Sequence, residues 1–140
     1  MFYEIHQLRE NLLLVRWTPK ATPNSQPEAN FIADLRSRFD AATQLVYVLS
    51  DLRYGKITDA YTLRELGKLT YHPKFGGGAA WATDISTTFY VGVFSRFAAP
   101  SKREDGAHAR LSDALAEIER RQPGLTNGID WDAISAYKPE

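Results

Sequence analysis

One stretch of the chain, VLSDLRYGKITDAYTLREL from Val48 to Leu66, passes from an apolar segment through a polar corner into a segment with helical periodicity. The apolar part belongs to Gln44–Leu52, which is rich in valine and leucine and predicts a strand buried on both faces. In the second part, leucines at positions 63, 66 and 69 have the spacing of a helix. Ligands and partners of α/β proteins often bind where a strand ends in this way. We therefore expect Gln44–Leu52 to lie mid-sheet and the corner after it to be exposed.

The residues before this stretch predict a β-hairpin and a long helix. The first 17 residues are typical of two antiparallel strands. Apolar residues are spaced as on one face of a strand from Tyr3 to Leu8, a turn follows at Glu10–Asn11, and Leu12–Trp17 is a nearly continuous apolar run. Ser25–Glu28 has the spacing of a capping box, in which the serine and the glutamate each bind a backbone N–H. Apolar residues at 32, 35 and 39 then predict an amphipathic helix of about 17 residues.

Downstream of the corner, the pattern predicts a short helix, a turn and a strand. Pro73 disfavours helical geometry at the residue before it, so the helix should end near His72. The glycines of KFGGG, at positions 76–78, are interpreted as a flexible turn, because the Gly-x-x-x-x-Gly-Lys-Ser/Thr pattern of a phosphate loop is absent. Ala79–Thr83 predicts a fourth strand. The charged segment Pro100–His108 is either a very short edge strand or a mobile loop.

The remaining residues predict helices. Leucines at 111 and 115 and Ile118 have helical spacing up to Pro123, and apolar residues at 129, 131, 134 and 137 suggest a last turn or two capped by Asp130. The predicted order is β-β-α-β-α-β-α-(β)-α. It implies a single α/β domain with a mixed, mostly parallel sheet of four or five strands, an N-terminal hairpin and about four helices.

Composition narrows the classes of function. The 140 residues contain 17 basic and 17 acidic side chains, so the net charge is zero and binding of nucleic acid or an acidic membrane surface is not expected. Without cysteine, the chain has no disulfide, thiolate nucleophile or thiolate metal ligand. We see no signal peptide in the first residues and no stretch of 18 apolar residues, and expect a cytoplasmic protein without a membrane span.

The helix predicted at Phe89–Phe97 is apolar over more than half of its circumference, with Ser86 or Thr87 as its cap. One stripe consists of Phe89, Val93 and Phe97, an adjacent stripe consists of Tyr90 and Phe94, and Val91 lies away from both. A surface helix normally has one apolar face, so a second contact is expected. Either a partner or ligand provides it, or the C-terminal tail with Trp131 and Tyr137 folds back over it.

Residues 1–121 resemble the STAS domain, and more closely the small divergent SpoIIAA-like proteins. The resemblance rests on VYVLSDL before the polar corner, on LGKLTYHPKFGGGAAWAT and on the helix start RLSDALAEI. Residues 122–140 then form a tail, with a short helix that packs on the domain or on a partner subunit. The resemblance implies a regulatory domain that binds proteins.

The corner departs from the family's motif. Phosphorylated members carry an Asp-Ser-Ser-Gly-Leu-like motif, and the matching residues here are Asp59, Ala60, Tyr61, Thr62 and Leu63. Tyr61 stands where the phosphorylated serine would be, so a serine kinase has no target at that position, although Thr62 keeps a hydroxyl. The free amides of a helix start would still favour an acidic group.

Ordinary structural roles explain most of the other polar residues. Asp51 and Arg53 could line a cleft, but an ion pair of this kind is more often structural. Asp59 is most simply a helix cap, with Thr58 as the alternative. The three histidines, at positions 6, 72 and 108, lie on different elements without metal-ligand spacing.

Two functions therefore compete. The first is a non-enzymatic domain that binds a protein partner or a second copy of itself, without cofactor, metal or catalytic residue. Its expected contact residues are Thr58, Asp59, Ala60, Tyr61, Thr62, Phe89, Tyr90 and Phe94. The second is a carrier of a small apolar, lipid-like ligand, held between sheet and helices by Phe89, Tyr90, Phe94 and Trp81. An enzyme is the third and least supported, since no nucleophile–base pair is visible.

Overall fold

The computed structural model describes residues 1–140 and contains a five-stranded sheet whose strands lie in the order of the sequence. The strands are β1 (Tyr3–Arg9), β2 (Leu12–Trp17), β3 (Val46–Asp51), β4 (Phe75–Trp81) and β5 (Ala107–His108). β1 and β2 are antiparallel, and every other pair of neighbours is parallel. The predicted α/β class and N-terminal hairpin are confirmed, and β3 is the middle strand as expected.

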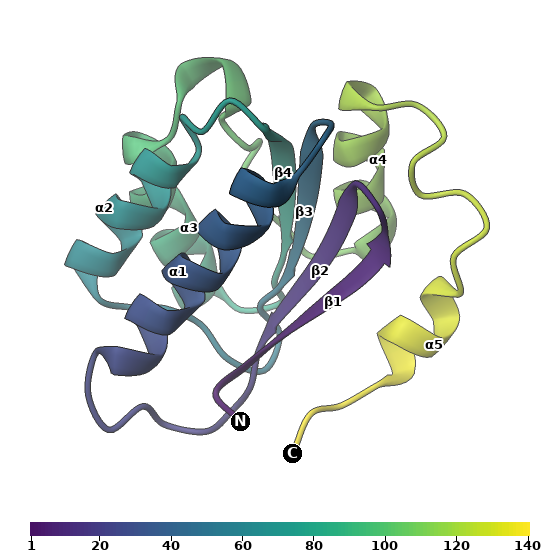
Figure 1. The fold of residues 1–140 in the computed structure, drawn as a ribbon. Helices are drawn as coiled ribbons and strands as arrows, with labels where there is room; N and C mark the ends of the chain where they lie inside the picture. Colours follow the sequence, from purple (N-terminus) through teal and green to yellow (C-terminus); the bar gives the residue numbers. More distant parts are fainter.

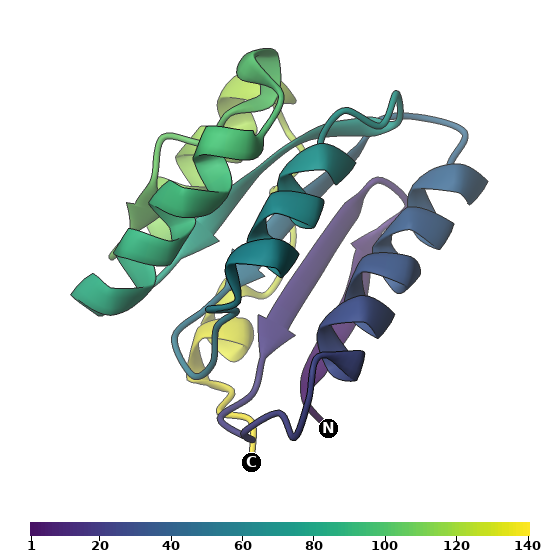
Figure 2. The ribbon, with the colours of Figure 1, turned by 90° about the vertical axis from the view of Figure 1, so that its left-hand side faces the viewer.

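Helices cover both faces of this sheet (Figures 1 and 2). They are α1 (Gln26–Ala41), α2 (Ala60–Leu69), α3 (Ile85–Phe97), α4 (Leu111–Arg121) and α5 (Trp131–Ala136). The three parallel crossovers each advance by one strand with the same hand, which places α1, α2 and α3 together on one face. The chain reaches the other face only after β5, where α4 and α5 lie.

The core has two layers because side chains alternate across the strands. On the α1–α3 side, residues such as Val15 and Val48 pack against Phe31 and Leu63. On the α4 side, the intervening residues, such as Leu14 and Leu49, pack against Ala114 and Ile118 of α4. A sheet covered on both faces explains why β2 and β3 are almost wholly apolar.

The glycine-rich segment is part of a strand, so the turn predicted at 76–78 is wrong. β4 begins at Phe75, four residues before the predicted start, and Gly77 and Gly78 pair with β3 while Gly76 lies at a register shift. Gly77 has a φ of +140°, and a Cβ there would lie 2.4 Å from the side chain of Arg121. Gly77 therefore lets Arg121 of α4 approach β4 closely, whereas a Cβ at Gly76 would meet the ring of Tyr47 and one at Gly78 the carbonyl of Val48, both on β3.

Two helix caps differ from expectation. Ser25 precedes α1 but makes no capping hydrogen bond, because its backbone (φ −85°, ψ 1°) is not extended as a capping residue requires. The capping box is therefore absent. At α3 the cap is Asp84, not Ser86 or Thr87; its carboxylate accepts from the backbone N of Thr87 at 3.0 Å.

The orientation of α3 also differs from the predicted stripes. Val91, which was expected to point away from both, is buried with 5% exposure, whereas Phe89 is 64% and Phe97 40% exposed. The side of α3 that faces the sheet therefore runs through Thr87 and Val91. The tail does not cover α3, because Trp131 packs with the core on the opposite face.

The segment 100–108 forms a 3₁₀ turn at Pro100–Lys102 and then the two-residue strand β5 at the edge of the sheet. Of the two alternatives left open for this segment, the structure contains the very short edge strand. No helix of the chain is both long enough and apolar enough to cross a membrane.

Candidate functional site

The corner after β3 leads to the start of α2, where Asp59 acts as the cap. Its carboxylate Oδ2 accepts from the backbone N of Thr62 at 2.9 Å and from the Thr62 hydroxyl at 2.7 Å. These hydrogen bonds lower the pKa of Asp59. The predicted cap is confirmed, and Thr58 takes no part in it. The chain's own carboxylate thus occupies part of the amide site that was expected to attract a partner's acidic group.

The residues expected to contact a partner divide into two groups. Thr58, Asp59, Ala60, Tyr61 and Phe89 are exposed on the outer surface of the molecule. Thr62 is buried, and its hydroxyl is already used in the hydrogen bond to Asp59.

The other two, Tyr90 and Phe94, are half-buried and face inward beneath the helices. Trp81 does not join them, since it lies with the core on the α4 face. The expectation that Phe89, Tyr90, Phe94 and Trp81 line one pocket is therefore wrong for Trp81, and also for Phe89, which is exposed and does not line the cavity. Successive residues of β4 face opposite sides of the sheet. Ala80, the residue before Trp81, therefore faces the cavity, and Trp81 faces away from it.

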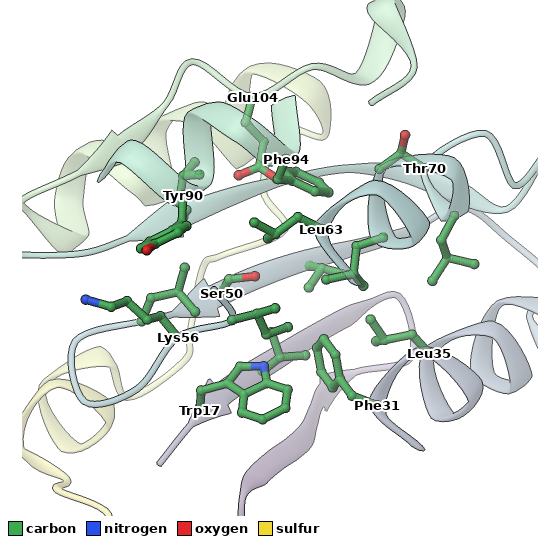
Figure 3. Close-up of a pocket in the computed structure, with 18 of the residues that line it drawn as sticks. Trp17, Phe31, Leu35, Ser50, Lys56, Leu63, Thr70, Tyr90, Phe94 and Glu104 are labelled. Carbon is green, nitrogen blue, oxygen red and sulfur yellow. The ribbon is translucent and has the colours of Figure 1, made fainter. Parts of the chain in front are cut away.

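The inward residues belong to an apolar cavity between the sheet and helices α1, α2 and α3 (Figure 3). Its volume is about 110 Å³, and 16 of its 21 lining residues are hydrophobic. The wall includes Val15, Trp17, Phe31, Leu35, Leu63 and Phe94. Small strand residues such as Ala80 leave this space open above the sheet, because they do not reach the helices.

One acidic side chain, Glu104, enters this apolar cavity from the segment before β5. The pKa of Glu104 is raised to about 8. Burial is the largest cause, and the nearby carboxylates of Glu117 and Asp105 raise the pKa further, while Arg121 lowers it only in part. No hydrogen bond contributes to this pKa. At neutral pH the group is therefore largely a protonated carboxylic acid.

Further polar groups line the same cavity. Ser50 lies on its floor, on β3, and Lys56 and Tyr90 are partly exposed where the wall reaches the surface. The wall also contains a buried donor without a partner, the indole Nε1–H of Trp17. A few polar groups in a mostly apolar cavity are typical of a small-molecule site, and an unpaired buried donor has a cost that core packing alone does not explain.

The Asp51–Arg53 pair lies on the other face and has a third member, Arg16. Arg53 Nε donates to Asp51 Oδ1 at 2.9 Å, and Arg16 Nε donates to Asp51 Oδ2 at 2.8 Å. The two guanidinium groups also donate to the carbonyls of Ile134 and Ser135 in α5, at 3.3 and 3.1 Å. This cluster attaches α5 to the sheet, which agrees with the structural interpretation of the pair.

Each histidine is paired with a carboxylate. His6 contacts Glu4 at 2.9 Å and His72 contacts Asp40 at 2.7 Å. His108 Nε2 lies 2.7 Å from Glu117 Oε1.

The second carboxylate oxygen of Glu117 accepts from the backbone N of Asp105 at 2.8 Å. Asp105 lies close to both side chains and pairs with Arg120. Because their hydrogen bonds are satisfied internally, these residues hold the segment 105–108 against α4, and we assign them no further role.

Sequence reasoning missed Glu104, Ser50 and Trp17. Glu104 lies in a charged loop, and only the position of that loop beside β4 brings it to the cavity. A usable signal existed for Ser50, because a hydroxyl inside an otherwise apolar central strand must face either a partner or a cavity.

The chain was compared with protein-family models, with curated proteins and with solved structures, and none matches it.

Proposed function

We propose that this protein is a non-enzymatic binding domain that takes up a small, mostly apolar molecule between its sheet and helices α1–α3. The observation that carries the proposal is the cavity of about 110 Å³ whose largely hydrophobic wall includes the side chain of Glu104. Apolar contacts would supply most of the affinity, and the few polar groups would orient the ligand.

The size of the cavity limits the ligand. A cavity of roughly 150 Å³ can hold benzene, whereas sites for larger ligands usually measure roughly 300–1,000 Å³. At about 110 Å³, this cavity suits a single small ring or a short aliphatic chain, with any further part of the ligand reaching out beside Lys56. A complete lipid chain, as in the lipid-like ligand expected from the sequence, is larger than the volume of this cavity.

Titration with toluene, followed by NMR, tests the proposal. We expect saturable shifts at cavity residues such as Val48 and Leu63, and none on α4. Ala80→Leu places a larger side chain on the cavity floor and should abolish the shifts. Ala116→Leu makes the same change at an exposed position of α4 and should leave them intact. Absence of saturable shifts in the unmodified protein, both with toluene and with its hydroxylated counterpart phenol, would overturn the proposal.

A second candidate is binding of a second copy of the chain, or of another protein, through the outer surface of α2 and α3. Large apolar side chains on this surface favour it: Ile85 is 90% exposed, and Tyr61 and Phe89 are exposed as well. Sedimentation should then reveal a dimer that dissociates in Phe89→Ser. If the partner is instead a different protein, Tyr61→Asp should abolish capture of that protein in a pull-down without lowering the melting temperature of the variant. Sedimentation as a monomer at high concentration would exclude the dimer.

We also propose a relation to STAS domains, with a regulatory role in the cytoplasm. The support is the sequence pattern around the corner, where Asp59 and Leu63 match the family's motif and the serines do not. The α/β fold is compatible with this relation but is common to many families. A pull-down with a panel of serine-kinase anti-sigma factors would test it, and no capture of any member would count against it.

A further inference from the structure

We infer that Glu104 is the residue that recognises the ligand of this cavity, and that it does so by hydrogen bonding to a hydroxyl group on a small apolar molecule. The inference rests on the proposed ligand-binding function and names the chemical class of the ligand. It is carried by the position of Glu104 and by the lack of any partner for it within the chain.

Glu104 lies against the cavity side of β4. A Cβ built on Gly78 would lie 3.6 Å from Glu104 Oε2, an ordinary contact distance, so the carboxyl group lies directly against this part of β4. Gly78 and Ala80 face the same side of the strand, and Ala80 lines the cavity. Figure 3 draws Glu104 and Phe94 on one side of the cavity and Trp17 and Phe31 on the other.

No basic side chain near the cavity pairs with Glu104. Arg121 donates to the backbone carbonyls of Ser101 and Arg103, at 3.0 and 3.1 Å. Lys102 donates to the carbonyl of His72 at 2.9 Å.

Across the cavity, Lys56 contacts Asp84 at 3.4 Å and Ser86 at 2.9 Å. The charged groups nearest to Glu104 are otherwise acidic, namely Glu117 and Asp105. A polar group in this position usually has a partner, so we expect the ligand to supply it.

The protonation state of Glu104 indicates the chemistry of that partner. A protonated carboxyl has one donor and one acceptor, which a hydroxyl group can satisfy together. A cationic ligand would require Glu104 to ionise among other acidic groups in an apolar environment, which burial opposes. The rest of the ligand would lie among apolar side chains such as Leu63 and Phe31. Small phenols and short alcohols meet these requirements.

Phenol and toluene provide the test, because they have the same shape and differ in the hydroxyl. Their dissociation constants are measured by NMR titration for the unmodified protein, Glu104→Leu and Glu104→Gln. In Glu104→Leu, the preference for phenol over toluene should fall by roughly 3- to 10-fold, the value of one net hydrogen bond. Glu104→Gln should keep most of the preference, because its amide is also a donor and an acceptor. Comparing a ratio within each variant cancels any change in cavity volume.

The outcomes separate the inference from the function on which it rests. If phenol and toluene both bind but their ratio is the same in all three proteins, Glu104 does not recognise the hydroxyl and the inference is wrong. Tighter binding of benzylamine than of phenol by the unmodified protein would also overturn it. If neither phenol nor toluene binds at all, the proposed function itself fails.

Discussion

Arg16 and Asp51 lie side by side at the carboxyl ends of two neighbouring parallel strands, joined by a hydrogen bond of 2.8 Å from Nε to Oδ2. Arg16 is 3% exposed and Asp51 is fully buried. Burial would raise the pKa of Asp51, but hydrogen bonds from Arg53 and Arg16 lower it, so the carboxylate stays charged. The buried Arg16 and the partly buried Arg53 thus share the carboxylate of Asp51, and Glu4 is a second partner of Arg16 at 3.4 Å. Both guanidinium groups in turn hold α5 through its backbone carbonyls.

Asp51→Asn should therefore destabilise the protein strongly. The change keeps the shape but removes the charge that compensates Arg53 and, together with Glu4, Arg16. Breaking a buried pair in this way costs about 3–5 kcal/mol. Urea unfolding should reveal the loss. Asp132→Asn, on the exposed surface of α5, provides the control and should change the free energy of unfolding by less than about 0.5 kcal/mol. Similar small effects for both variants would mean that the cluster is not needed for stability.

The cap of α2 gives a second prediction, with a control in the neighbouring residue. Asp59→Ala removes the acceptor for the backbone N of Thr62 and should lower the free energy of unfolding by about 1 kcal/mol. Thr58→Ala removes a side chain that takes no part in the cap and should change it by less than about 0.5 kcal/mol. Chemical denaturation of both variants is the measurement. Equal effects would contradict the assignment of Asp59 as the cap.

The order of the elements follows from local patterns, and the sequence was sufficient to predict it. The apolar run of β3 had to be covered on both faces, which made it central, and Asp59 and Asp130 were recognisable as caps from the residues that follow them. The start of β4 was predicted at Ala79 and not at Phe75, because its glycines resemble a turn in the sequence. Gly77 instead accommodates the close approach of Arg121 from α4, a contact between residues 44 positions apart, and Gly76 and Gly78 accommodate Tyr47 and Val48 of β3. No local pattern contains these contacts.

The candidate site was less predictable for the same reason. Tyr90 and Phe94 were expected to line a cavity and do so, but the side of β4 that faces it was not known until the strand's register was known. Glu104 reaches the cavity only through the position of a loop between two elements. A helix that is apolar over more than half of its circumference, as α3 is, carries little signal for which side is buried.

The protonated state of Glu104 predicts a specific dependence of stability on pH. Its pKa of about 8 in the folded chain lies above the ordinary value of 4.5, so between these values the folded state holds a proton that the unfolded state has lost. Stability should therefore fall as the pH rises through this window, and level off above pH 8.

Glu104→Gln removes this titration. It should be more stable than the unmodified protein at pH 8 by roughly 1–3 kcal/mol, which is less than the full shift implies because the residue is partly exposed. Near pH 4 the two proteins should have similar stability. Denaturation at a series of pH values is the measurement, and parallel curves for the two proteins would show that Glu104 is ionised throughout this range.

The orientation of α3 can be tested by a pair of truncations on that helix. Val91 is buried on the side of α3 that faces the sheet. Val91→Ala should lower the free energy of unfolding by roughly 1–3 kcal/mol, because the lost contacts leave a cavity. Phe89 is a larger side chain but is mostly exposed, so Phe89→Ala should change the free energy of unfolding by less than about 0.5 kcal/mol. Denaturation of the two variants at low protein concentration isolates folding from any self-association. If Phe89→Ala were the more damaging change, α3 would be rotated and its outer surface would be part of the core; if the loss appeared only at high concentration, Phe89 would lie in a contact between two copies.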